Sequence, residues 1–194
     1  THHGAFDLAS LRVVPNLTIA SPMDEKELRR LMYTAAQPDK GCFVIRYPRG
    51  RGIYTEWKCP LETIEVGTGR KINDGEDVAV LTLGPIGNDV QDVIATMDKK
   101  PAHYDMRFLK PLDGNLLKEV ADKYKHIITI EDGVRNGGMG TAVMEWLNDN
   151  GYTNISVKRM GIPDKFIEHG SIDELRAIIG LDNDTIKKTI CSYM

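Results

Sequence analysis

Short apolar segments that favour β-structure alternate with amphipathic helical segments from residue 78 to the end, and this alternation constrains the fold more than any other feature. We expect strands at 78–83, 102–108, 127–130 and 155–160. We expect helices at about 88–97, 114–124 and 141–148, and two more from Ser171 and Asp182. Alternation of this kind predicts a mostly parallel sheet with helices on both faces, and therefore a complete small α/β domain.

The first 50 residues contain only a strand, a helix and a second strand. Apolar residues at 17–20 and 42–45 predict the strands, and Asp24 with Glu27 predicts a capping box at the start of the helix. Apolar residues at helical spacing predict its core-facing stripe: Leu28, Leu31, Met32, Ala35 and Ala36. A strand–helix–strand unit leaves sheet edges unpaired, so we expect it to need further chain to complete its domain.

The composition changes between about residues 49 and 77. Glycines, Pro60 and the alternating residues 63–66 predict an extended linker followed by an edge hairpin. The sequence Asn73-Asp74-Gly75 predicts a turn. The linker would separate the incomplete first unit from the regular second one.

Charge and composition exclude several classes of protein. A net charge of -3 gives no field that favours nucleic acid or an anionic membrane, and no apolar run is long enough to span a bilayer. The chain opens on polar residues at Thr1, which do not form a secretory signal. Three scattered cysteines without zinc-ligand spacing predict reduced thiols in a cytoplasmic protein: Cys42, Cys59 and Cys191.

A pair of histidines lies in the opening segment, Thr1–Leu8. An imidazole beside a glycine can lie close to a ligand, where it can stabilise a developing oxyanion or transfer a proton near neutral pH. The residue types alone leave a surface loop or the remnant of a purification tag as alternatives for His2 and His3.

A second candidate segment, Arg46–Gly50, follows the predicted strand at 42–45. Ligands of open α/β sheets gather at the carboxyl ends of strands, and a planar guanidinium matches two phosphate oxygens at once. The segment therefore predicts a phosphate clamp, with a solvated basic turn as the alternative.

Two further loops carry weaker signals. Glu131–Gly140 is rich in glycine but has neither G-x-G-x-x-G spacing nor a Walker lysine, so we interpret its glycines as allowing close helix–strand packing. Gly161–Gly170 forms a loop without a clear chemical role.

The isolated histidines are expected to be structural or to lie at the surface: His103, His126 and His169.

Taken in order, these segments resemble the thiamine-dependent transketolase superfamily, and within it the 1-deoxy-D-xylulose-5-phosphate synthase family. The segments that carry the resemblance are Thr1–Leu8, Leu11-Arg12, Pro15-Asn16, Ser21–Leu28, Val44–Gly50, Asp105–Asp113 and Gly161–Asp164. They cover essentially the whole chain, and Arg46–Gly50 is specific within the superfamily. Because the pattern continues beyond His3, both histidines are interpreted as native residues.

The resemblance implies a homodimeric parent enzyme with three domains, of which this chain is a C-terminal fragment. Residues 1–50 would end the α/β pyrimidine-binding domain, 51–64 would form a linker, and 65–194 would form the C-terminal domain. The parent binds thiamine diphosphate through a magnesium ion. Its Gly-Asp-Gly metal motif and its activating glutamate have no counterpart here. The fragment alone is therefore expected to bind neither cofactor nor metal and to be inactive.

The family condenses pyruvate with glyceraldehyde 3-phosphate, which gives 1-deoxy-D-xylulose 5-phosphate and carbon dioxide. By motif position, His2 corresponds to the histidine that contacts the donor or the developing alkoxide. Arg49 corresponds to the arginine that grips the phosphate of the aldehyde. His3 replaces a glutamine of many members and is given no role.

Three alternatives remain open from the sequence. The parent could be another transketolase-superfamily enzyme, such as a true transketolase. The chain could be a stand-alone α/β assembly module that binds an anion at Gly133–Gly140. It could also be a purely structural dimerisation domain.

Overall fold

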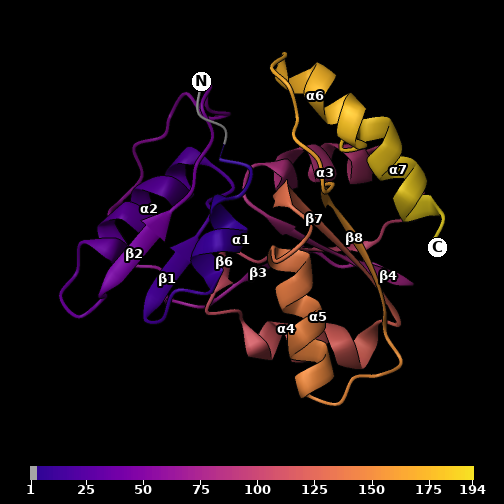
Figure 1. Ribbon diagram of the computed structural model, residues 1–194, viewed down its shortest axis with the longest axis horizontal. Coiled ribbons are helices and arrows are strands. Elements are labelled where there is room, and N and C mark those ends of the chain that lie inside the picture. The colour runs from indigo at the N-terminus through magenta and orange to yellow at the C-terminus, as the bar shows by residue number, and fades with distance from the viewer. Residues whose placement is uncertain (1–3) are drawn as a thin grey trace.

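The computed structural model describes residues 4–194, and Figure 1 shows two layered α/β units lying side by side. The first unit contains α1 (Asp7–Arg12), β1 (Leu17–Ala20), α2 (Glu25–Ala35) and β2 (Cys42–Ile45). The second begins with β3 (Arg70–Asn73), β4 (Val78–Leu83), α3 (Ile86–Ala95), β5 (Ala102–Asp105), β6 (Phe108–Lys110) and α4 (Gly114–Lys123). It ends with β7 (His126–Val134), α5 (Met139–Asp149), β8 (Ser156–Ile162), α6 (Ile172–Ile179) and α7 (Asn183–Cys191).

The larger sheet has the strand order β3-β5-β4-β7-β8, and its four strands from β5 to β8 run parallel. The edge strand β3 pairs antiparallel with β5. Both faces of β4 are buried: Val78 and Val80 pack with α3 and α7, whereas Ala79 and Leu81 pack with α4 and α5. This architecture confirms the predicted α/β fold with a mostly parallel sheet flanked by helices.

The strand expected at 102–108 is divided between two sheets. Arg107 has a φ of 55°, in the left-handed region, and the chain turns there out of the larger sheet. The following residues form β6, which pairs antiparallel with β1 and gives the smaller sheet the order β2-β1-β6. The expectation of one continuous strand is therefore wrong, because β6 leaves its own unit to cover one edge of β1.

The helix α2 begins as expected but buries a different face. Asp24 caps it by accepting from the backbone N–H of Glu27 at 2.8 Å. The Glu27 carboxylate does not complete a capping box, because it accepts from the N–H of Met23 instead. Leu31 is fully buried, as expected, but Met32 is 60% exposed, and Thr34 lies on the buried side. The predicted apolar stripe is therefore only partly correct.

The segment between β2 and β3 contains no strand and lies along α2. Ile64 is buried and donates its N–H to the Thr34 hydroxyl at 2.8 Å. The Arg29 guanidinium donates to the carbonyl of Cys59 at 2.9 Å and also lies near the Trp57 ring. The predicted hairpin at 63–66 is wrong, since the edge strand is β3 and it pairs with β5.

No helix among residues 4–194 is both long enough and apolar enough to cross a membrane.

Candidate functional site

The carboxyl ends of β1 and β2 meet the carboxyl ends of β4 and β7, and this junction is the candidate site. The Asn88 amide donates to the carbonyl of Met23 at 2.7 Å. The Arg46 guanidinium donates to the carbonyl of Asp132 at 3.0 Å. A Cβ atom at Gly84 would lie 2.4 Å from the Ser21 hydroxyl oxygen, so these two segments of the chain approach closely only because this residue is glycine.

A cavity of about 240 Å³ opens at this junction. It is lined by Pro22, Met23, Asp24, Glu25, Leu28, Tyr47, Pro48, Gly50, Arg51, Gly52, Ile53, Pro85 and Asn88. The lining combines an apolar wall with carboxylates and an arginine, which suits a small polar ligand.

The junction also fills the place where an open α/β sheet usually binds ligands. In the larger sheet, β4 has β5 on one side and β7 on the other, so the crevice of the topological switch point lies at the ends of β4 and β7. Ser21, Met23 and Arg46 of the first unit contact residues at these ends. The crevice therefore serves to dock the first unit.

Arg49 lies in the exposed loop that follows β2. Its neighbours Pro48 and Gly50 line the cavity. Within residues 4–194, its guanidinium has neither a hydrogen bond nor an ion pair.

His2 lies outside the described residues. The described chain resumes close by, and the carbonyl of Ala5 accepts from the N–H of Val134 at 2.9 Å. Beside it, a second cavity of about 160 Å³ is lined by Phe6, Val134, Asn136, Ile162 and Asp164. The Phe6 ring meets the ring of Phe166 edge to face, with 5.9 Å between centroids. The segment that follows His2 thus lies against the second unit.

The glycine-rich turn after β7 is occupied by a carboxylate of the chain itself. Glu131 is buried and accepts from the N–H groups of Met139 and Gly140, at 2.8 and 2.9 Å. These two groups form the start of α5, where a phosphate would otherwise bind. A Cβ at Gly138 would lie 2.4 Å from the same carboxylate. The geometry supports the interpretation that these glycines allow close packing.

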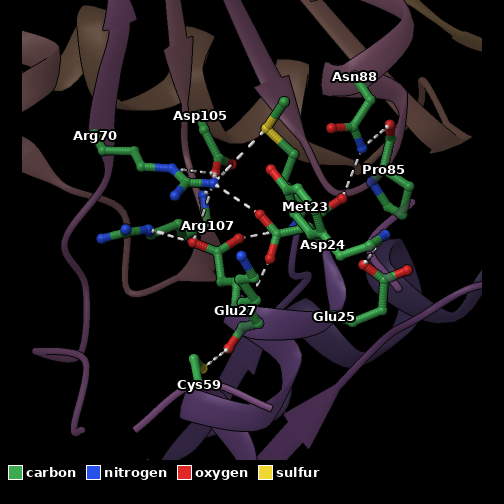
Figure 2. A network of polar contacts seen from close by, with 12 residues as sticks. Met23, Asp24, Glu25, Glu27, Cys59, Arg70, Pro85, Asn88, Asp105 and Arg107 are labelled. Carbon is green, nitrogen blue, oxygen red and sulfur yellow. Dashed lines mark hydrogen bonds and ion pairs between the residues drawn. The ribbon is translucent and has the colours of Figure 1, made fainter. Parts of the chain in front are cut away.

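A cluster of buried and partly exposed charged side chains joins the two units (Figure 2). The Glu27 carboxylate, only 3% exposed, accepts from the Arg107 guanidinium at 2.6 Å and lies 3.5 Å from that of Arg70. Arg70 also donates to Asp105 at 3.0 Å and lies 3.8 Å from Asp24. Burial, together with the charge of Glu27, raises the pKa of Asp105 to about 7. The cluster connects α2, β3 and the turn between β5 and β6.

The isolated histidines behave as structural or surface residues. His103 is fully buried, with its Nε2 2.9 Å from the Thr82 hydroxyl. Burial and the charge of Arg70 lower the pKa of His103 to about 4, so it is neutral at physiological pH. His126 lies beside the ring of Tyr193, and His169 is exposed.

The described residues hold no group of three or more His, Cys, Asp or Glu side chains that could bind a metal ion.

Comparisons with known proteins agree with the fold and with the junction between two units. Residues 67–186 match the family described as "Transketolase, C-terminal domain", and residues 1–52 match "Transketolase, pyrimidine binding domain". The chain belongs to the transketolase family.

Its relatives carry a more specific name. The 1-deoxy-D-xylulose-5-phosphate synthase of Bacteroides thetaiotaomicron is 59% identical over 98% of this chain, and that of Chlorobaculum tepidum is 42% identical over 100%. The chain covers only 30% and 31% of these two proteins. A solved structure described as "Split gene transketolase, inactive beta4 tetramer" superposes with a TM-score of 0.84 at 29% identity, covering 99% of this chain and 62% of that one.

The sequence did not reveal the buried charge cluster. Its members come from three distant parts of the chain, and Asp105 and Arg107 fall inside an alternating segment that looks like one strand. The alternation of charged residues with Tyr104, Met106 and Phe108 was the one available signal.

Replacement of Arg107 by Met should lower the free energy of unfolding of the chain by about 3 kcal/mol, because Glu27 would lose its shortest ion pair while remaining buried. Urea denaturation measures the effect. Arg30→Met is the matched control, since Arg30 pairs with Glu62 at the surface and should cost less than about 1 kcal/mol. Equal effects of the two substitutions would contradict a special role for the cluster.

The Glu131 carboxyl should lower the stability of the chain as the pH rises from about 5 to about 8, whereas His103, whose pKa is lowered, acts in the opposite direction below about pH 6.5. Burial raises the pKa of Glu131 from its ordinary 4.5 to about 7, against the lowering effect of its two N–H partners. The folded state therefore binds the extra proton between these values, and a difference of this size corresponds to about 3 kcal/mol lost through pH 7. Glu131→Gln should make the decline of stability through pH 7 smaller in urea denaturation but should not abolish it, because burial also raises the pKa of Asp105 to about 7. An unchanged decline would remove Glu131 as its source.

Proposed function

We propose that the chain is the C-terminal part of a thiamine-diphosphate-dependent synthase that condenses pyruvate with glyceraldehyde 3-phosphate to 1-deoxy-D-xylulose 5-phosphate and carbon dioxide. The observation that carries this proposal is the identity of 42% to 59% with synthases of that name over nearly the whole chain. Its product would be a precursor of isoprenoids, thiamine and pyridoxal. We further propose a homodimer in the cytoplasm.

The proposed domain boundaries follow the two units. Residues 1–50 would end the pyrimidine-binding domain, 51–64 would be the linker, and 65–194 would form the C-terminal domain. The family matches at 1–52 and 67–186 support this division. The strand-free linker along α2 also supports it.

Arg49 would grip the phosphate of glyceraldehyde 3-phosphate. Its exposed loop beside the larger cavity supports this role, and so does the absence of a partner for its guanidinium within residues 4–194. A pair of charge-assisted hydrogen bonds from an arginine to a phosphate contributes about 1.5–3 kcal/mol, or roughly ten- to a hundredfold in binding.

His2 would contact the donor or hold a proton at the developing alkoxide. The contact of Ala5 with the second unit supports a location near the junction for the segment that carries it.

Thiamine diphosphate, when bound, supplies the stabilised carbanion that this reaction needs. The described residues contain no group of three or more His, Cys, Asp or Glu side chains that could hold the magnesium ion, which supports a cofactor site elsewhere. Other parts of the parent protein would have to bind both, and the chain alone would be inactive. Its own contribution would be to orient the phosphate-bearing substrate through Arg49 and the donor through His2.

Two alternatives are less well supported. A true transketolase is less well supported because the chain is 59% identical to a protein named 1-deoxy-D-xylulose-5-phosphate synthase and only 29% identical to the split-gene transketolase. A module that binds an anion at Gly133–Gly140 is disfavoured by Glu131, whose carboxylate already accepts from two N–H groups of the turn.

In the full-length protein, Arg49→Ala should raise the KM for glyceraldehyde 3-phosphate about 10- to 100-fold and leave the KM for pyruvate nearly unchanged, because only the aldehyde carries a phosphate. Steady-state kinetics with each substrate varied in turn measures both constants. Equal increases in the two constants would remove Arg49 from the phosphate role.

The isolated 194-residue chain should bind no thiamine diphosphate tightly in the presence of magnesium ion. Isothermal titration calorimetry tests this directly, with the full-length protein as the positive control. Micromolar binding together with turnover by the isolated chain would contradict the proposal that the cofactor site lies elsewhere.

A further inference from the structure

The end of β7 and the turn after it, residues 131–137, contact both segments that carry the candidate site residues. We call this stretch the β7 turn. It belongs to the second unit, whereas both segments belong to the first. Neither the glycines of the turn nor Glu131 has a role in the function proposed above.

The first contact lies three residues after His2. Val134 of the β7 turn donates its backbone N–H to the carbonyl of Ala5 at 2.9 Å. Further along, the Arg12 guanidinium donates to the carbonyl of Gly137 at 2.9 Å and pairs with Glu145 of α5. The segment that leads from His2 into α1 is thus held at two points by backbone groups of the turn.

The second contact lies three residues before Arg49. The guanidinium of Arg46 donates to the carbonyl of Asp132 at 3.0 Å. The backbone of Arg46 is also held: its N–H donates to the carbonyl of Ala20 at 2.9 Å, and its carbonyl accepts from the Ser21 hydroxyl at 2.9 Å. The loop that carries Arg49 therefore leaves from a point fixed by both units.

The β7 turn is itself held from several sides. The Glu131 carboxylate fixes its start against α5. The carbonyl of Arg135 accepts from the Thr141 hydroxyl and from the Arg159 guanidinium, both at 2.9 Å, and its N–H donates to the carbonyl of Ile162. The backbone groups that face the first unit consequently have little freedom to move.

We propose that the β7 turn fixes the start of the loop that carries Arg49, and that Arg46 is the positioning residue for Arg49. This inference rests on the proposed phosphate-binding role of Arg49. Within the described residues, the turn contacts Ala5 and also Arg46, three positions before Arg49, so a shift of the turn would move the loop that carries Arg49. A displacement of about 1 Å at such a group can cost on the order of a hundredfold in rate.

The test uses the full-length protein and the substitution Arg46→Met, which keeps the length of the side chain but removes its donors. The KM for glyceraldehyde 3-phosphate should rise about tenfold, and the KM for pyruvate should change less than about twofold. Arg46→Lys, which keeps a donor, should recover part of the loss. Arg29→Met is the matched control, because Arg29 also donates to a backbone carbonyl, that of Cys59, and should leave both constants unchanged.

A double-mutant cycle separates positioning from general destabilisation. If Arg46 acts through Arg49, the double variant should have a KM for glyceraldehyde 3-phosphate no more than about threefold above that of Arg49→Ala alone. Fully multiplicative effects, or equal increases in both constants for Arg46→Met, would overturn the inference. If Arg46→Met does not fold, Arg46→Gln, which removes the charge and shortens the side chain, takes its place.

The same data distinguish this inference from the function on which it rests. If Arg49→Ala raises only the KM for glyceraldehyde 3-phosphate and Arg46→Met changes neither KM, the positioning role alone is overturned. Absence of a selective effect of Arg49→Ala would overturn the phosphate-binding role, and the inference with it.

Discussion

The structure depends on the buried carboxylate of Glu27, which lies between two arginines at the junction of the units. An isolated buried charge would cost several kcal/mol, so Arg107 and Arg70 must remain beside it. Arg107 lies in the turn that sends β6 to the smaller sheet, and Arg70 lies on the edge strand β3. The ion pairs of Glu27 and the pairing of β6 with β1 thus depend on neighbouring residues. Together they hold the two units as one body.

This arrangement determines what the second unit can do. The crevice at the ends of β4 and β7 receives the first unit, and the start of α5 receives Glu131. Two places where an α/β domain commonly binds a ligand are therefore filled by the protein itself. The second unit instead provides fixed backbone groups, the carbonyl of Asp132 and the N–H of Val134. These groups form hydrogen bonds with segments of the first unit.

Local signals in the sequence were sufficient for most elements. The apolar run at 78–83 became the central strand β4, and Ser171 with Glu174 forms a capping box at α6. The division of 102–108 could not be predicted, because it depends on pairing with β1 and on a left-handed turn that no local pattern requires. Arg49 was proposed by resemblance, whereas the contact made by Arg46 was not predicted, since its partner is a backbone carbonyl 86 positions away in sequence.

Native-state hydrogen exchange on the 194-residue chain tests most directly whether the two units behave as one body. The N–H of Ser21 donates to Arg107, and that of Val134 donates to Ala5, so both amides report on the junction. The account predicts that these two amides exchange with the same opening free energy as the central amides of β4. Opening of the junction amides at a free energy several kcal/mol lower, with β4 still protected, would contradict it.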